Sequence, residues 1–166
     1  MLYWLILIVG SVVLDQLTKW LAVAQLKGQA SFPLWEGVLH FTYVENTGAA
    51  FGSFKDHRWV FMIVSTVAII ALIAYYFLGR QYDRLTVTAL AFITGGGVGN
   101  MIDRILLGYV VDFIDFTLID FAVFNVADSF VCVGVGLMFL ALILAERKEA
   151  KAKQSASAGK ETAHDD

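Results

Sequence analysis

Four long apolar stretches, separated by shorter and more polar segments, organise the chain. They cover residues 2–24, 59–78, 85–102 and 123–145. An α-helix needs about 20 mostly apolar residues to cross the hydrocarbon of a bilayer. The pattern therefore predicts an all-α membrane protein with four transmembrane helices. An even number of spans places both ends of the chain on the same side of the membrane.

The two longer connections, residues 25–58 and 103–122, carry most of the polar residues outside the spans. Residues 38–44 of the first read Val-Leu-His-Phe-Thr-Tyr-Val, an apolar and aromatic run typical of a strand. We therefore expect a small β-sheet at about residues 25–58, resting on the membrane surface, and a short outer loop or helix in the second connection.

Basic residues mark the other face of the membrane. They follow the second and fourth spans, and they are Arg80, Arg84, Arg147, Lys148, Lys151 and Lys153. Cytoplasmic loops carry an excess of lysine and arginine. The pattern thus predicts cytoplasmic termini and two outward-facing long connections.

A cleaved signal peptide is an alternative for the first apolar stretch, because residues 22–24 read Ala-Val-Ala. The stretch lacks a basic segment ahead of it, and Asp15, Lys19 and Trp20 interrupt it before the possible cleavage site. These features favour a retained span.

Composition agrees with a membrane protein. Hydrophobic residues make up 58% of the 166 residues and charged residues 16%, and the mean hydropathy is +0.70. We expect a membrane domain at 1–150 and a disordered cytoplasmic tail at 151–166. The net charge of -3 is spread over the tail and isolated positions, so nothing indicates nucleic-acid binding. Cys132 is the only cysteine, and we expect it to be buried and inert.

Ionisable side chains within the apolar stretches are the first candidates for function, because each costs about 2.5–3.5 kcal/mol at the centre of a span. Asp15 and Lys19 are four residues apart and so lie on one helix face, where they can pair. Asp128 has no basic residue within helical reach on its own segment. Its partner must therefore come from elsewhere in the chain.

The segment 108–116 supplies further carboxylates, including Asp112, on the same predicted side of the membrane as Asp128. Two carboxyl groups that share a low-dielectric site have separated pKa values, so that one is protonated while the other is ionised. That state suits an aspartic protease, with one acid as general base and the other as general acid. Acids at a membrane interface are also often only solvated or paired with arginine, and both readings stay open here.

Other chemistries find little support. The sequence lacks H-E-x-x-H, G-x-S-x-G and a Cys–His pair. The glycine-rich run at 95–99 lacks the Gly-Lys-Ser/Thr ending of a phosphate loop, and Gly95 and Gly99 have the G-x-x-x-G spacing of close helix packing. Asn100, Asp103 and Arg104 share one helix face, either as a polar cap or as a substrate site.

Five ordered motifs together resemble the lipoprotein signal peptidases of bacteria, also called type II signal peptidases, which are four-helix membrane aspartic proteases. The motifs are D-Q-L-T-K at 15–19, N-T-G-A-A-F at 46–51, G-N-M-I-D-R at 99–104, V-D-F-I at 111–114 and F-N-V-A-D-S at 124–129. The likeness runs along most of residues 10–145. Ala122 stands where many members have proline.

The resemblance implies roles for individual residues. Asp112 and Asp128 match the catalytic pair of the family. The residues that match its substrate-binding positions are Asn46, Gly48, Asn100, Arg104 and Asn125. Those that match supporting positions are Asp15, Lys19 and Asp103. Family matching alone selects Asp112 over Asp115 or Asp120, and neither a metal nor a cofactor is implied.

The resemblance also implies a substrate and a location. The substrate is a prolipoprotein whose signal peptide is removed just before a diacylglyceryl-cysteine. The site is then near the extracytoplasmic face of the bacterial plasma (inner) membrane, open to membrane lipid, in a chain that acts as a monomer. A proton-coupled transporter using Asp15, Lys19 and Asp128 as a relay, and a non-catalytic membrane scaffold, are the two competing hypotheses.

Overall fold

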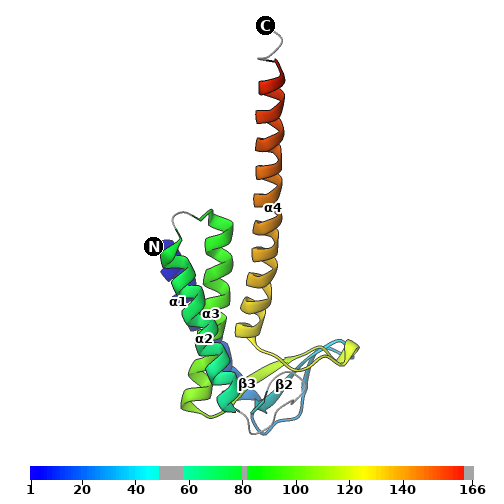
Figure 1. Cartoon of the computed structure of the whole chain (residues 1–166). Helices are drawn as coiled ribbons and strands as arrows, with labels where there is room; N and C mark the ends of the chain where they lie inside the picture. Colours follow the sequence, from blue (N-terminus) through cyan, green and yellow to red (C-terminus); the bar gives the residue numbers. More distant parts are fainter. Residues whose placement is uncertain (49–57, 80–81, 163–166) are drawn as a thin grey trace.

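The structure is a computed structural model that describes residues 1–48, 58–79 and 82–162. It consists mainly of helices, with a small three-stranded antiparallel sheet at one end (Figure 1). In chain order the elements are α1 Leu2–Leu26, β1 Phe32–Trp35, β2 Leu39–Asn46, α2 Arg58–Leu78, α3 Arg84–Leu106, β3 Val110–Asp115, the 3-10 helix η2 Thr117–Ile119 and α4 Val126–Thr162. Arg80 and residues 49–51 of the N-T-G-A-A-F motif lie outside the described residues.

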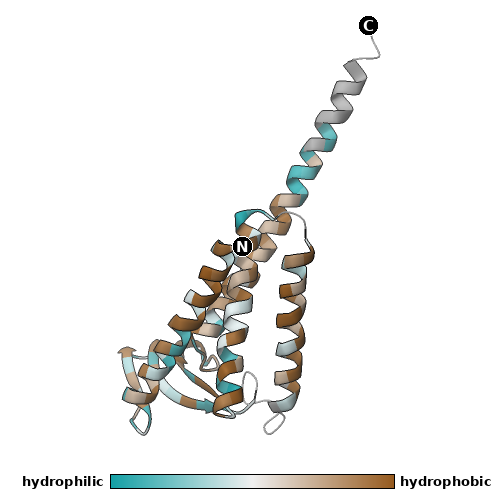
Figure 2. Ribbon diagram, turned by 90° about the vertical axis from the view of Figure 1, so that its left-hand side faces the viewer, coloured by the Kyte–Doolittle hydropathy of each residue, from teal (hydrophilic) through white to brown (hydrophobic). Residues whose placement is uncertain are grey.

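All four predicted apolar stretches form helices, and three of these are long and apolar enough to cross a membrane. These three are α1, α3 and the portion Val126–Lys151 of α4. The apolar part of α2 that the structure describes, Met62–Leu78, is shorter. Figure 2 shows that most residues along the helices are hydrophobic and that a more hydrophilic part of α4 follows. The chain is thus a multi-pass membrane protein.

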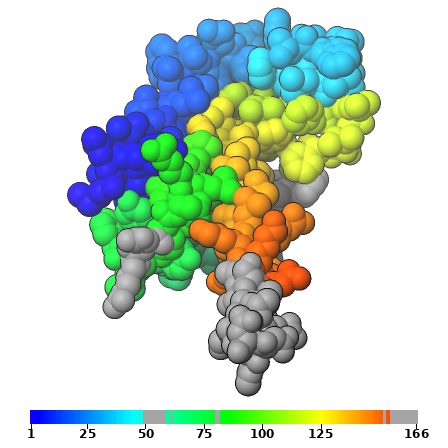
Figure 3. Space-filling model, turned by 90° about the horizontal axis from the view of Figure 1, so that it is seen from above, coloured from blue at the N-terminus to red at the C-terminus, as the bar shows by residue number. Residues whose placement is uncertain are grey.

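Helix α3 lies at the centre of the bundle, where it contacts α1, α2 and α4 (Figures 1 and 3). Its glycines allow this close approach. A Cβ atom on Gly95 would collide with Ser11 of α1, and one on Gly99 would lie 2.5 Å from Asp15 Oδ2. A Cβ atom on Gly96 would collide with the carbonyl oxygen of Ala127 in α4. The predicted G-x-x-x-G packing through Gly95 and Gly99 is confirmed.

The sheet has the strand order β1-β2-β3, with β2 in the centre, and β2 includes most of the predicted strand at 38–44. Val111 and Phe113 of β3 pack on Ala22 near the end of α1, which fixes the sheet against the bundle. The backbone of Phe124 then returns to Ile114 and exchanges hydrogen bonds with it. This return places the first turn of α4 beside β3.

The structure differs from the sequence-based expectation at the C-terminal end. Helix α4 continues to Thr162, whereas the composition predicts a disordered tail from residue 151. Residues 151–162 include three alanines, three lysines and one glutamate, residue types that favour helices. Residues 163–166 lie outside the described residues, and the boundary between membrane domain and tail stays a prediction.

Candidate active site

Asp112 is held on β3 by two asparagine side chains. Its side chain is buried, with 2% of the residue exposed. Asn46 of β2 donates from Nδ2 to Asp112 Oδ2 at 2.8 Å. Asn125 donates from Nδ2 to Asp112 Oδ1 at 2.6 Å. Both carboxylate oxygens therefore accept an amide N–H from elements that are far apart in the sequence.

Asp128 lies in the first turn of α4, where Asn125 caps the helix. Asn125 Oδ1 accepts from the backbone N–H of Asp128 at 3.0 Å, and Asp128 Oδ2 accepts from the backbone N–H of Asn125 at 3.1 Å. This reciprocal pair is a capping box. It fixes the Asp128 side chain close to the helix start. The backbone N–H of Asn125 in this cap is therefore one of the partners that Asp128 needs.

Asn100 of α3 supplies the second partner of Asp128. Its Nδ2 donates to Asp128 Oδ1 at 2.7 Å, and its Oδ1 accepts from Asn125 Nδ2 at 3.0 Å. Arg104, one turn further along α3, donates from its guanidinium to the Asn100 carbonyl oxygen at 3.3 Å. Asn125 bonds to both acids, and so Asp112 and Asp128 are brought to one site.

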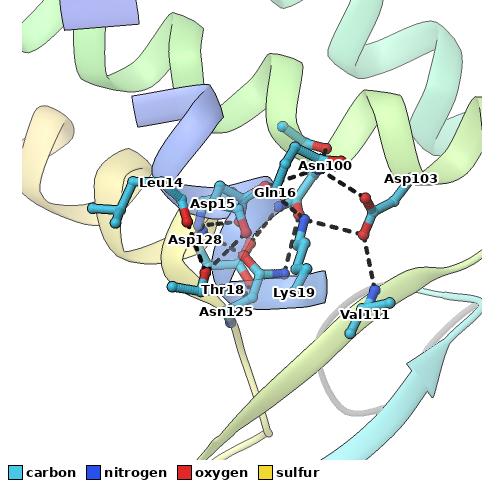
Figure 4. A network of polar contacts seen from close by, with 12 residues as sticks. Leu14, Asp15, Gln16, Thr18, Lys19, Asn100, Asp103, Val111, Asn125 and Asp128 are labelled. Atoms are coloured by element: carbon cyan, nitrogen blue, oxygen red, sulfur yellow. Dashed lines mark hydrogen bonds and ion pairs between the residues drawn. The ribbon is translucent and has the colours of Figure 1, made fainter. Parts of the chain in front are cut away.

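A cluster of buried charges lies next to this site (Figure 4). Lys19 Nζ is 2.9 Å from Asp15 Oδ2 and 3.1 Å from Asp103 Oδ2. Asp15 Oδ1 also accepts from the backbone N–H of Ala127 at 2.9 Å, and Asp103 Oδ2 accepts from that of Val111 at 3.0 Å. The cluster thus connects α1, α3, β3 and α4. The predicted pairing of Asp15 with Lys19 is confirmed.

Gln16 is part of the same network, although sequence reasoning did not single it out. Its Nε2 donates to Asp103 Oδ1 at 2.9 Å and to the carbonyl oxygen of Gly99 at 3.2 Å. The sequence did contain a signal for this role, namely a glutamine next to an aspartate within an apolar span. It shows that α1 contributes a neutral donor as well as the charged pair.

A cavity of about 550 Å³ opens beside the two acids. Its polar lining comes from the residues Asn46, Gly48, Asn100, Arg104, Asp112, Asp128 and Ser129. Its apolar lining comes from Val110, from residues 121–124 and from Cys132 and Val133 of α4. The residues that the resemblance assigns to catalysis or substrate binding therefore line one cavity, except Asn125, which lies behind the lining and bonds to both acids. Asp15, Lys19 and Asp103 do not appear in this lining.

Cys132 corrects an expectation from the sequence. The structure leaves this thiol exposed, not buried, and it lines the cavity one helical turn after Asp128. An apolar stretch does not reveal which of its faces turns away from the bundle, and this residue lies on such a face.

The position of Cys132 predicts how the cavity responds to added volume. We expect Cys132→Phe to narrow the apolar part of the cavity and to raise Kd for an apolar ligand of the cavity, whereas Cys132→Ser leaves Kd near its wild-type value. Val135→Phe is the matched control, because Val135 is exposed and is not part of the cavity lining. Equal Kd values for Cys132→Phe and Val135→Phe would contradict the binding of apolar groups in this cavity.

The two other acids near β3 lie elsewhere. Asp115 accepts a hydrogen bond from Thr42 Oγ1 at 2.7 Å on the sheet. Asp120 follows η2 in a left-handed conformation, with φ of 50°, and is exposed. Neither residue contributes to the cavity lining, so the geometry singles out Asp112 as the carboxylate that accompanies Asp128.

The environment of Asp112 favours its protonated form. Burial raises its pKa from 3.8 to about 6, and repulsion from Asp128 acts in the same direction. Hydrogen bonds from Asn46 and Asn125, and the charge of Lys19, limit the increase. Desolvation and a like charge together give a carboxyl group that gains and loses its proton near neutral pH. Within residues 1–48, 58–79 and 82–162, no group of three histidine, cysteine or acidic side chains could hold a metal ion.

The fold and this site define a multi-pass helical membrane protein with a pair of acids at the end of its bundle. The family model described as signal peptidase (SPase) II matches residues 7–144. The chain therefore belongs to the signal peptidase II family and is a protease.

Individual relatives agree with this assignment. The chain is 44% identical over 158 residues to the lipoprotein signal peptidase of Halalkalibacterium halodurans, covering 93% of this chain and all of the relative. It is 44% identical over 147 residues to that of Brevibacillus brevis, covering 87% and 98% of the two chains. A bacterial membrane enzyme solved by the in meso method at 1.9 Å resolution has a TM-score of 0.77 at 35% identity, with 86% and 93% covered.

Proposed function

We propose that this chain is a membrane-embedded aspartic endopeptidase. Its substrates are diacylglyceryl-modified prolipoproteins, and it removes their signal peptides by cutting just before the lipidated cysteine. The observation that carries this proposal is the pair of acids in one cavity, with Asn125 hydrogen-bonded to both of them. Membership of the signal peptidase II family supports the choice of substrate.

Asp112 and Asp128 act as the catalytic pair and share one proton in the working state. The ionised carboxylate takes a proton from a water molecule as its oxygen attacks the peptide carbonyl carbon. The protonated carboxyl group donates to the carbonyl oxygen and stabilises the tetrahedral intermediate. Proton return to the leaving amine then breaks the carbon–nitrogen bond and restores the pair. The resting proton belongs to the pair as a unit.

The other candidate residues hold the acids or bind and orient the substrate. Asn46, Asn100 and Asn125 hold the two acids, while Arg104 and the buried Gly48 border the space in which the peptide backbone would lie. The apolar lining from residues 121–124 and Val133 offers a surface to acyl chains or to an apolar signal helix. Such a substrate can enter from the bilayer without leaving the hydrocarbon.

The membrane placement follows from the same proposal. Helix α2 completes four spans in the bacterial plasma membrane, both termini are cytoplasmic, and the acids lie near the extracytoplasmic face. The sheet then lies at the membrane surface, where the exposed side chains of Phe32, Leu34 and Trp35 on β1 would contact lipid. In this proposal the protein works as a monomer.

A direct test is the cleavage of a purified diacylglyceryl-modified prolipoprotein by the purified full-length protein in detergent. Mass spectrometry of both products should place the cut immediately before the lipidated cysteine. The same precursor without its diacylglyceryl group is the control, and we expect little cleavage of it. Proton-coupled transport without proteolysis would overturn the proposal, as would cleavage at unrelated sites.

The raised pKa of Asp112 predicts the pH dependence of the enzyme. As the pH rises through about 6, Asp112 loses its proton, and the pair loses its general acid. We expect kcat/KM to fall toward alkaline pH with an apparent pKa near that value, in a profile measured from about pH 4 to pH 9. Asp115→Asn should leave this alkaline limb in place. A flat profile up to the alkaline end would exclude Asp112 from the pair.

A further inference from the structure

Lys19 is surrounded by acceptors at the base of the candidate active site. Its side chain is 4% exposed. Its ammonium group lies 2.9 Å from Asp15 Oδ2, 3.1 Å from Asp103 Oδ2 and 2.8 Å from Asn100 Oδ1. An ammonium group has three N–H donors and no acceptor. These three contacts use all of its donors, and two of them are to carboxylates that balance its charge.

This arrangement decides which way the Asn100 amide points. A group that only donates can face the oxygen of an amide but not its NH2 group. The Asn100 oxygen must therefore point to Lys19, which turns the NH2 group to the opposite side. There Nδ2 donates to Asp128 Oδ1 at 2.7 Å (Figure 4).

The same oxygen also constrains Asn125. Asn125 donates from Nδ2 to Asn100 Oδ1 at 3.0 Å and to Asp112 Oδ1 at 2.6 Å. Its own oxygen accepts the backbone N–H of Asp128 at 3.0 Å. If the Asn100 amide were reversed, the NH2 groups of Asn100 and Asn125 would face each other. Asp128 would then lose the donor from Asn100, and the Asn125 donor to Asp112 would be displaced.

We propose that Lys19 is a positioning residue for both acids of the catalytic pair. It holds the oxygen of Asn100, and this turns an amide N–H onto Asp128. The same oxygen holds Asn125, whose second amide N–H lies on Asp112. The inference rests on the proposed function, since it assigns Lys19 a task in the same reaction.

Asp15 and Asp103 serve this arrangement by balancing the charge of Lys19 and by fixing its position. Asp15 is anchored by the backbone N–H of Ala127, and Asp103 by that of Val111. The lysine is thereby tied to the start of α4 and to β3, which are the two elements that carry the catalytic acids. A shift of either element would be transmitted to the amide network, so the cluster couples the folding of the bundle to the geometry of the pair.

Lys19→Met tests the proposal, because methionine keeps similar length but has neither charge nor donor. With the Asn100 amide free to reverse, we expect kcat to fall by about 100-fold while KM stays near its wild-type value. The alkaline limb of the pH profile should also move to higher pH. Asp112 faces Asp128 on α4, Lys19 on α1 and Arg104 on α3, and removing Lys19 takes away a positive charge from this set.

A double variant keeps the test decisive if the single variant folds poorly. Asp15→Asn combined with Lys19→Met removes one negative and one positive charge, so the net charge of the cluster is unchanged. We expect it to fold and to show the same loss of kcat. Lys27→Met is the matched control, because Lys27 is an exposed lysine at the end of α1 that pairs with Glu45 at 2.9 Å. It should keep wild-type kcat, KM and pH profile.

The outcomes separate this inference from the proposed function. A folded Lys19→Met or double variant with wild-type kcat would overturn the positioning role, and so would a pH profile that does not move. If Asp112→Asn and Asp128→Asn are inactive in the same assay while Lys19→Met is active, only the inference fails. If those asparagine variants remain active, the proposed catalytic pair itself is wrong.

Discussion

Replacing either Asp112 or Asp128 by asparagine is expected to lower kcat by about 10²- to 10⁴-fold, the size of a general acid–base contribution. Asparagine has nearly the same shape, but it neither accepts a proton from water nor delivers one to a peptide carbonyl. Single-turnover cleavage of a lipid-modified precursor would measure the loss directly. Binding of the precursor should remain near its wild-type affinity, because the cavity lining keeps its shape.

The stability of Asp112→Asn should separate lost chemistry from lost folding. The folded-state pKa of Asp112 is raised to about 6 from 3.8. The folded state therefore binds the Asp112 proton more tightly than the unfolded state does. The resulting contribution to the free energy of unfolding is fully present below the lower pKa and is lost as the pH rises through the higher one. At pH values above the raised pKa, asparagine removes the cost of a buried charge. We expect Asp112→Asn to unfold at a temperature no lower than wild type in that range.

Asp115→Asn is the matched control for this pair of variants. Asp115 is on the same strand as Asp112, but its carboxylate accepts from Thr42 on the sheet and is absent from the cavity lining. We expect near-wild-type cleavage. Cleavage by either Asp112→Asn or Asp128→Asn at the wild-type rate, or loss of cleavage in Asp115→Asn alone, would contradict the assignment.

Asp15→Leu is expected to lower the free energy of unfolding by about 3–5 kcal/mol, because it breaks a buried ion pair by removing one partner. Asp15 is fully buried. Its loss would leave Lys19 with one carboxylate fewer and the backbone N–H of Ala127 without its acceptor. Denaturant or thermal unfolding in a mild detergent, followed by circular dichroism, would measure the change.

Glu45→Gln is the matched control for the buried pair, because Glu45 pairs with Lys27 at the surface. The distance between the charged atoms is the same, 2.9 Å in both pairs, but the side chains of Lys27 and Glu45 are 51% and 40% exposed. Solvent screening makes exposed pairs contribute little, so the unfolding temperature should not change. Equal effects of the two substitutions would mean that burial does not decide the strength of the Asp15 pair.

Periodicity and local spacing explain what could be predicted. Asp15 and Lys19 pair as their four-residue spacing predicts, and Gly95 and Gly99 pack as the G-x-x-x-G spacing predicts, because both features lie on a single helix. The catalytic and substrate-binding candidates lie on different elements, and these came from the motif resemblance. Cys132 was misjudged, since hydropathy alone does not tell which helix face is covered.

The sequence by itself determined the membrane class, the helices, a strand and the identity of the candidate acids. The class, the helices and the strand follow from local properties, namely the length of apolar runs and the cost of charges within them, and the acids follow from the motif resemblance. Only the tertiary structure decided that Asn125 bonds to both Asp112 and Asp128, and that Lys19 orients Asn100 toward Asp128. These contacts join four separate elements. Their geometry depends on how β3 returns along Phe124 to the start of α4, and no local pattern encodes that return.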